Sequence, residues 1–317
     1  VTFVGNNVTA TVTVNSNDNV IKANNITTTG DYAVDLKAKT GNTVTDNYLV
    51  SSSHKGDGAV KFSNANNDVE NNIPTINVTV TAESVWIGSN SNVVVTIPNA
   101  TGTVTIKVND KEYTVDLDEN GTATKEIPAE DLVAGENDVT VSYNSDVYGI
   151  KKNSTVLFVT DGVVTQDTYL YYFNQEDNGK LFDYIPEGAT LDFQGSIINP
   201  DTKIVVQMNV NKPVNIISTT KDAYVDLNTT AGSLLGESPG NSFAVTNGGS
   251  GSNVTGIYFH NTQVWISNTS NVVLDNISVV VEDQRVGSGV GATTIRDNSS
   301  NVVLKNSYLY TRNNGGS

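Results

Sequence analysis

Cysteine is absent from this chain of 317 residues, and histidine occurs only twice, as His54 and His260. The lack of cysteine excludes disulfides, thiolate metal sites and thiol nucleophiles. The two histidines lie far apart, in segments that we assign to different domains, which argues against a histidine-rich zinc site. We therefore expect the chain to hold no metal ion and no cofactor.

Basic residues are also scarce. Lys and Arg number 18 against 34 Asp and Glu, so the formal net charge is −16 and the pI is about 4.3. Nucleic acids and anionic membranes are bound through clustered basic residues, so we expect neither as a partner. No apolar run reaches the roughly eighteen residues that a membrane span needs. The chain starts at Val1 without a signal-peptide pattern, which predicts a mature chain or an excised fragment.

The abundant residues are Asn, Thr, Val and Ser, a composition typical of strands and turns. Dense Asn-X-Ser/Thr sequons predict glycosylation of an exported chain. The candidate glycosylation sites are Asn7, Asn77, Asn99, Asn120, Asn153, Asn228, Asn268 and Asn298.

One phrase recurs in the C-terminal part. Asn271–Val279 returns thirty residues later as Asn301–Leu309, and Asn253–Phe259 is a looser copy. A strand phrase that recurs with variable filler is typical of stacked coils, here a parallel β-helix with strands ~4.8 Å apart. Strand alternation predicts these inward side chains: Val272, Leu274, Val279, Val302, Leu304 and Leu309.

Two pairs of polar residues align between the copies of this phrase. Asp275 and Lys305 predict an ion pair on the surface. Asn276 and Asn306 predict a buried ladder of amides at a bend, so we expect the Asn276 sequon to stay unglycosylated.

Residues 1–75 carry a repeat of their own. It places Asn24, Asn47 and Asn72 at spacings of 23 and 25 residues, a suitable length for one coil. We interpret this segment as the last coils of one β-helix, and residues 161–317 as the N-terminal cap and first coils of a second. Tyr169–Phe173 is aromatic on both faces. It predicts a hydrophobic plug at the open end of that helix, rather than a platform for carbohydrate.

Residues 76–160 show short alternating strands at even spacing, which predicts an immunoglobulin-like sandwich. Asn109-Asp110 and residues 118–121 each predict a hairpin turn. We expect Tyr143 to lie in the core of this sandwich or at one of its corners. The fold class predicted for the chain is therefore all-β, with right-handed parallel β-helix segments flanking an Ig-like β-sandwich.

Three further stretches are Asn42–Val50, His54–Val60 with Val69–Asn72, and Lys212–Ile216. Together with this order of segments, they resemble the adhesin-like surface proteins of methanogenic archaea. In that family, parallel β-helix segments alternate with bacterial-type Ig-like repeats. The resemblance implies an extracellular location at the cell surface and adhesion to other cells or host glycans. It supplies no catalytic motif.

The function that we expect is therefore adhesion without catalysis, with carbohydrate or a surface protein of another cell as partner. Tyr258, Ser278 and Tyr308 fall in one predicted outward column, and we predict that Tyr258 and Tyr308 bind ligand by stacking on sugar rings. The alternative is a β-helix enzyme that cleaves polysaccharides, or its accessory module, which needs clustered carboxylates on adjacent coils. The residues available for that chemistry are Asp275, Glu282, Asp283, Arg285, Asp297 and Lys305.

Overall fold

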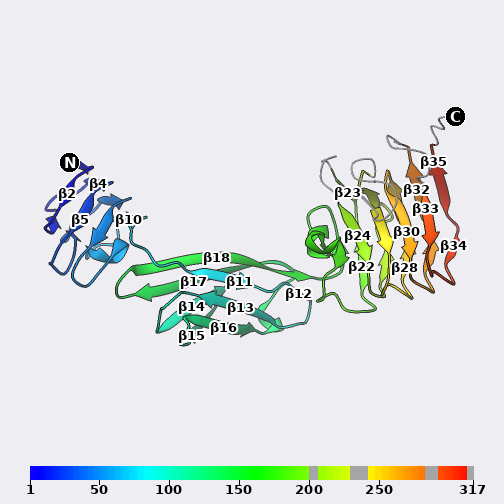
Figure 1. Cartoon of the computed structure of the whole chain (residues 1–317), viewed down its shortest axis with the longest axis horizontal. Helices are drawn as coiled ribbons and strands as arrows, with labels where there is room; N and C mark the ends of the chain where they lie inside the picture. The colour runs from blue at the N-terminus through cyan, green and yellow to red at the C-terminus, as the bar shows by residue number, and fades with distance from the viewer. Residues whose placement is uncertain (200–205, 229–241, 283–291, 313–317) are drawn as a thin grey trace. The chain divides into compact units, whose positions relative to one another are not determined.

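The computed structural model describes residues 1–199, 206–228, 242–282 and 292–312, and this part of the chain is all-β, as predicted. It contains 35 strands and four short 3-10 helices (Figure 1). The chain divides into two compact units. Unit 1 comprises Val1–Glu83 with Gly88–Leu157, and unit 2 comprises Ser84–Ile87 with Phe158–Ser317.

The first part of unit 1 consists of three parallel sheets. Each strand pairs with the third strand after it, so the chain visits the three sheets in rotation (Figure 1). We call one such round a coil, and residues 1–73 the N-terminal stack. Its sheets are β1-β4-β7-β10 (Thr2–Val4, Val20–Lys22, Thr43–Thr45, Asp68–Glu70), β2-β5-β8 (Asn7–Val8, Asn25–Thr27, Tyr48–Val50) and β3-β6-β9 (Val12–Thr13, Val34–Asp35, Val60–Lys61).

Buried asparagines join the coils of the N-terminal stack. The Asn24 side-chain amide donates to Asn47 Oδ1 at 2.9 Å, and the Asn47 amide donates to Asn72 Oδ1 at 2.8 Å. The spacing noted in the sequence is therefore the length of a coil. Each amide also bonds backbone groups that the bend leaves unpaired, as with Asn47 Nδ2 and Ile21 O. A second ladder through Asn19, Asn42 and Asn67, which we did not predict, closes another bend.

The rest of unit 1 is antiparallel. One sheet has the order β11-β13-β16 (Thr79–Ala82, Ser91–Thr96, Thr122–Ile127), and the other has the order β18-β17-β14-β15 (Gly149–Thr160, Gly135–Ser145, Thr103–Val108, Lys111–Asp116). Val104, Ile106 and Val108 are buried, while the residues between them are more accessible, so one face of the second sheet is covered. Tyr143 is also buried, and its hydroxyl donates to Thr101 O at 3.0 Å.

The two predicted hairpins have different outcomes. Asn109-Asp110 is a two-residue turn, since Val108 pairs with Lys111 and Asn109 has φ +51°. Residues 118–121 do not close a hairpin, because they lead from β15 to β16, which belong to different sheets. The Asp118 carboxylate accepts from two backbone N–H groups there. Such a local turn forms whether or not its flanking strands pair.

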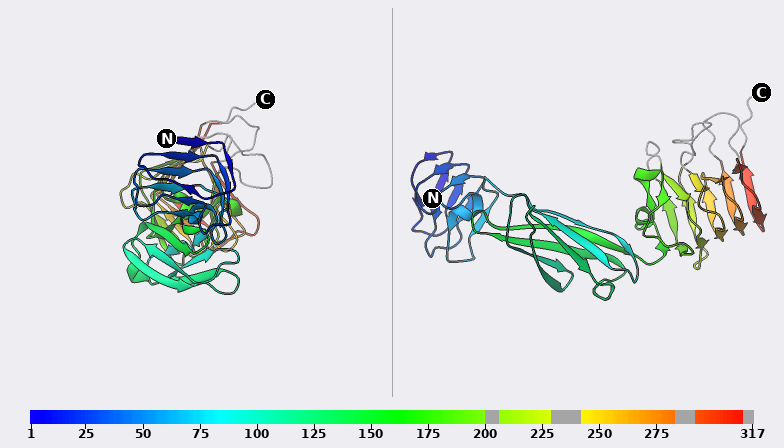
Figure 2. Two further views of the ribbon diagram at one scale, coloured as in Figure 1. Left: turned by 90° about the vertical axis from the view of Figure 1, so that its left-hand side faces the viewer. Right: turned by 60° about the horizontal axis from the view of Figure 1, so that its bottom comes forward.

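Unit 2 consists mainly of three more parallel sheets visited in rotation, and we call residues 163–311 the C-terminal stack (Figure 2). The first sheet is β19-β22-β25-β28-β31-β34 (Val163–Val164, Thr190–Phe193, Asn215–Ile217, Asn253–Thr255, Val273–Asp275, Val303–Lys305). The second is β20-β21-β24-β27-β30-β33 (Phe173–Asn174, Lys180–Leu181, Gln207–Val210, Ser242–Val245, Gln263–Ser267, Thr293–Arg296), in which the β20–β21 pair is antiparallel and the other pairs are parallel. The third is β23-β26-β29-β32-β35 (Ser196–Ile198, Tyr224–Asp226, Tyr258–His260, Ser278–Val281, Tyr308–Thr311).

Large apolar side chains fill the C-terminal stack. Phe193, Phe243 and Phe259 are fully buried in one continuous core. Tyr172 and Phe173, from the stretch expected to form a plug, are buried in the same core. Trp86 of β12 (Val85–Trp86) packs against it too, because β12 pairs with the end of β18 at Val159 and Thr160.

The repeated phrase lies in the predicted register. Val273, Leu274 and Asp275 pair with Val303, Leu304 and Lys305. The expected inward residues Val272, Leu274 and Val279 are fully buried, and Val302 packs against the core. Leu304 and Leu309 are exposed instead, because no coil that the structure describes covers the last one.

The predicted amide ladder at Asn276 and Asn306 is wrong, because both residues are exposed. They have φ +52° and +54°, so they supply the left-handed backbone of the bend, where Asn is favoured. The buried position of the bend is the next residue, Ile277.

Candidate functional site

Tyrosines gather on the outer face of the sheet β23-β26-β29-β32-β35. The register places Ser196, Tyr224, Tyr258, Ser278 and Tyr308 in one column across the five strands. Tyr258 and Tyr308 are exposed. They are therefore accessible to a ligand, as stacking on a sugar would require. Whether they bind one stays a prediction.

A second column runs beside the first on the same face. It contains Ile198, Asp226, His260, Val280 and Tyr310. We call the five rings of the two columns, those of Tyr224, Tyr258, His260, Tyr308 and Tyr310, the tyrosine face. The sequence reasoning missed Tyr224, His260 and Tyr310. The similar triplets Tyr224–Asp226 and Tyr258–His260, each tyrosine, apolar residue, polar residue, were the available signal.

Hydrogen bonds orient the centre of the tyrosine face. Asp226 Oδ2 lies 2.8 Å from His260 Nδ1 and accepts from the Tyr224 hydroxyl at 3.4 Å. The Tyr224 and His260 rings stack with centroids 5.7 Å apart, and the Tyr258 ring meets Tyr224 edge-on at 5.3 Å. His260 Nε2 lies 3.7 Å from Glu282 Oε2. Neighbouring groups thus fix the ring orientations before any ligand arrives.

The phenols of Tyr224 and Tyr258 remain protonated at neutral pH, because their pKa values are raised. Partial burial raises the pKa of Tyr224 to about 12, and the nearby Asp226 carboxylate adds to the rise. Burial raises the pKa of Tyr258 as well, followed by the charges of Glu282 and Asp226. The face therefore offers neutral O–H donors beside carboxylate acceptors and aromatic rings. Such a surface can stack on the apolar side of a sugar ring and hydrogen-bond its hydroxyls.

The carboxylates considered for catalysis are dispersed. Asp275 lies on β31, Glu282 follows β32 and Asp297 follows β33, and these strands belong to three different sheets. Asp283 and Arg285 lie outside the described residues. Asp275 forms the predicted ion pair with Lys305 at 3.2 Å. A hydrogen bond from Asn306, followed by the effect of Lys305, lowers the Asp275 pKa, so this carboxylate stays ionised at neutral pH and cannot act as a general acid.

Within the described ranges, no group of three or more His, Asp or Glu side chains is placed to hold a metal ion. No helix in those ranges is long and apolar enough to cross a membrane.

The sequon asparagines occupy varied positions. Those that are exposed are Asn7, Asn77, Asn99, Asn120, Asn153, Asn268 and Asn298. Asn228 is half-buried. The Asn153 amide nitrogen donates to Val78 O at 2.6 Å, which leaves one of its two hydrogens for the attachment of a glycan. Use of these sites stays a prediction.

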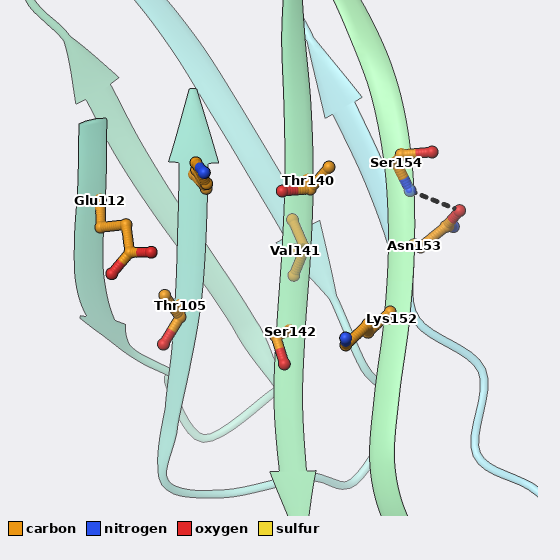
Figure 3. A pocket seen from close by; sticks show the side chains of 9 residues that line it. Thr105, Glu112, Thr140, Val141, Ser142, Lys152, Asn153 and Ser154 are labelled. Carbon is orange, nitrogen blue, oxygen red and sulfur yellow. Dashed lines mark hydrogen bonds between the residues drawn. The ribbon is translucent and has the colours of Figure 1, made fainter. Parts of the chain in front are cut away.

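A hollow of about 600 Å³ lies on the outer face of the sheet β18-β17-β14-β15 in unit 1 (Figure 3). Thr140 and Ser142 form its floor, and Lys152 extends toward them from β18 (Figure 3). Lys107 and Glu112 face each other across β14 and β15. This lining includes no aromatic ring, so the hollow offers less to a sugar than the tyrosine face does.

Comparison with protein-family models, with curated proteins and with solved structures finds no match for this chain.

Proposed function

We propose that the chain is a non-catalytic part of an extracellular adhesin or stalk on the surface of a methanogenic archaeon. In this proposal the two stacks are right-handed parallel β-helix segments, and the antiparallel part of unit 1 is an Ig-like sandwich between them. Three sheets visited in rotation support the first assignment. Two antiparallel sheets and a buried tyrosine bonded to distant backbone support the second.

The observation that carries the adhesive function is the tyrosine face. Its rings stand in columns on successive coils, and Asp226 and Glu282 place carboxylate acceptors beside them. Each ring contact stabilises a complex by only about 0.5–1.5 kcal/mol. We therefore propose weak binding of carbohydrate at each site, or of a surface protein of another cell, strengthened by repetition. Linking several copies raises apparent affinity by ~10²–10⁴ when their spacing matches the target.

A glycan array tests this proposal, with the chain applied as a monomer and as a tetramer. We expect weak monomer signals and strong tetramer signals that disappear in the double variant Tyr258→Ala with Tyr308→Ala. Tyr48→Ala is the matched control, because Tyr48 is also an exposed tyrosine but lies on the N-terminal stack. Tight binding by the monomer would contradict the avidity argument, and tetramer binding unchanged in the double variant would exclude the tyrosine face.

The second candidate is a polysaccharide-cleaving enzyme, and the His260–Asp226 contact is the observation that favours it. A carboxylate at 2.8 Å from Nδ1 fixes the ring so that Nε2 can act as a base. Release of reducing ends or unsaturated products from a polysaccharide panel, abolished by His260→Ala, would support the enzyme. Products that persist in His260→Ala would not come from this site.

A further inference from the structure

Unit 1 contains a junction where the antiparallel part meets the last coils of the N-terminal stack. The tip of the β17–β18 hairpin lies against the segment before β9. The backbone N–H of Lys55 donates to Val147 O at 2.7 Å. The approach is close, because a Cβ atom at Gly58 would lie 2.4 Å from the same carbonyl oxygen. Only glycine at this position lets the hairpin tip lie so near.

Asp57 connects this hairpin to the asparagine ladder. Its Oδ1 accepts from the Asn72 side-chain amide at 2.9 Å and from the Asn72 backbone at 3.0 Å. Its Oδ2 forms an ion pair with Lys151 of β18. The ladder thus ends on a carboxylate that also holds the hairpin, and the junction is fixed by charge and hydrogen bonds as well as by packing.

Beside the hairpin tip lies a hollow of about 460 Å³, which we call the junction hollow. One part of its lining is apolar. Phe62 and Ile150 come from opposite sides of the junction and are 43% and 61% exposed, and Val60 and Val69 lie with them. Ligand sites in proteins have volumes of roughly 300–1,000 Å³ and occur preferentially where domains meet. The hollow meets both conditions.

The remaining lining is polar. Tyr32 stacks on His54 with centroids 4.4 Å apart, and Lys61 Nζ lies 5.5 Å from the centre of the Tyr32 ring. Asn144 and Asp146 come from the hairpin. Within the described residues, the side chains of Asn144 and Asp146 have no hydrogen-bond partner. The polar part of the lining therefore supplies an amide, a carboxylate and an ammonium group.

We propose that the junction hollow binds one neutral sugar residue. A pyranose has an apolar face of C–H groups and a rim of hydroxyls, which match the Phe62–Ile150 side and the polar side respectively. The charges favour a neutral ligand, because Lys61 and Asp146 carry opposite charges in the same lining, and Asp57 is already paired with Lys151. This site is separate from the tyrosine face and does not depend on it.

Binding at this site also links the ligand to the junction. The ligand contacts both the coil side and the hairpin side of the hollow, so it binds only when the hairpin is docked. By linkage, a ligand that binds only the docked form stabilises that form. The bound sugar therefore stabilises the docked arrangement of the N-terminal stack and the antiparallel part of unit 1.

The test is an NMR titration of the full chain with isotope-labelled isoleucine methyl groups. The probes are glucose, galactose, mannose and N-acetylglucosamine, with glucuronate as an acidic sugar and leucine as an apolar zwitterion. We expect at least one neutral sugar to shift the Ile150 methyl signal in a saturable way. Phe62→Ala should lower the affinity for that sugar about tenfold, because it removes one aromatic contact with the ligand. Asn144→Ala should lower the affinity as well, and it should not disturb the fold, because Asn144 is exposed and its side chain bonds to no other described residue.

The matched control is Tyr48→Ala, since Tyr48 is as exposed as Phe62, at 43%, and belongs to the same stack but not to the hollow. It should leave the affinity unchanged, as should Tyr258→Ala with Tyr308→Ala. The proposal is wrong if no neutral sugar shifts the Ile150 signal. It is also wrong if leucine or glucuronate binds more tightly than every neutral sugar, or if the shifts survive in both Phe62→Ala and Asn144→Ala.

Discussion

The two stacks make the same bend with different chemistry. In the N-terminal stack, β4 is followed by Ala23 with φ +53° and then by the buried Asn24. In the C-terminal stack, β28 is followed by Gly256 with φ +76° and then by the buried Ile257. The left-handed residue is common to both, so the backbone path is shared, while the next position holds an amide in one stack and an aliphatic side chain in the other.

This difference shows two ways of joining coils. The amides at Asn24, Asn47 and Asn72 bond to one another and to backbone groups, so each needs its neighbours at hydrogen-bond distance. The isoleucines at 257 and 277 are buried in a continuous apolar core, and apolar burial has no directional requirement. We infer that hydrogen bonds at the bends hold the coils of the N-terminal stack in register, while burial of apolar side chains joins the coils of the C-terminal stack.

The largest expected effect comes from a charge placed in that interior. Leu274→Asp should unfold the C-terminal stack, because a buried unpaired carboxylate costs several kcal/mol. Amide hydrogen exchange measured by segment should show loss of protection in unit 2, with strand β11 and strands β13 to β17 of unit 1 still protected. Loss of both units together would contradict separate cores.

A smaller loss should follow removal of one ladder amide. Asn47→Ala removes the acceptor of the Asn24 backbone N–H and the side-chain donor to Ile21 O. It also removes one of the two hydrogen bonds made by the Asn24 side-chain amide and one of the two accepted by Asn72 Oδ1. We expect the free energy of unfolding of the N-terminal stack to fall by about 3 kcal/mol, since each unsatisfied buried group costs about 1–3 kcal/mol. Hydrogen exchange in urea over residues 20–50 measures it.

The control for this prediction is Asn276→Gly in the other stack. Asn276 is exposed at φ +52°, so glycine can take its place with a change within about 0.5 kcal/mol. A large loss there with none in Asn47→Ala would reverse our assignment of the two joining mechanisms.

The comparison can be sharpened by exchanging the chemistry of one bend. Ile277→Asn puts a lone amide into an apolar core and should cost about 3 kcal/mol. Adding Ile257→Asn gives that amide a neighbour on the adjacent coil, so the double variant should lose about 1 kcal/mol less than the sum of the single losses. Strict additivity in a double-mutant cycle would show that the bend cannot be rebuilt with amides.

The sequence predicted features that repeat and missed those that depend on a single position. The Asn24–Asn47–Asn72 spacing and the pairing of Leu274 with Leu304 were recoverable because each coil restates them. The amide ladder predicted at Asn276 and Asn306 is wrong because Asn is favoured both at a left-handed bend and in an amide ladder, and the buried position next to Asn276 holds Ile277. Only the backbone angles separate the two roles.

The candidate site was less predictable than the fold. Tyr258 and Tyr308 could be aligned through the repeated phrase, but 34 residues separate Tyr224 from its neighbour Tyr258, and no repeat of constant length connects them. The junction hollow could not be predicted at all. Its lining joins Phe62 to Ile150, which only the docking of a hairpin on a coil brings together.

The smallest expected effect concerns the tyrosine face, which lies on the outside of the C-terminal stack, and it is seen in the titration of Tyr224. The pKa of Tyr224 is about 12 in the folded chain, above the value of about 10 for an unperturbed tyrosine. Because the folded-state pKa is raised, the associated stability is fully present below pH ~10 and is lost as pH rises through about 12. Absorbance titration of tyrosinate should therefore show a late component that Tyr224→Phe reduces by one phenol. Tyr113 of unit 1 also has a raised pKa of about 12, from burial and its hydrogen bond to Asp131, so Tyr113→Phe serves as the reference. A late component that Tyr113→Phe reduces and Tyr224→Phe leaves unchanged would show that the Tyr224 phenol is neither buried nor held beside Asp226. The ordered centre of the tyrosine face would then lose its support.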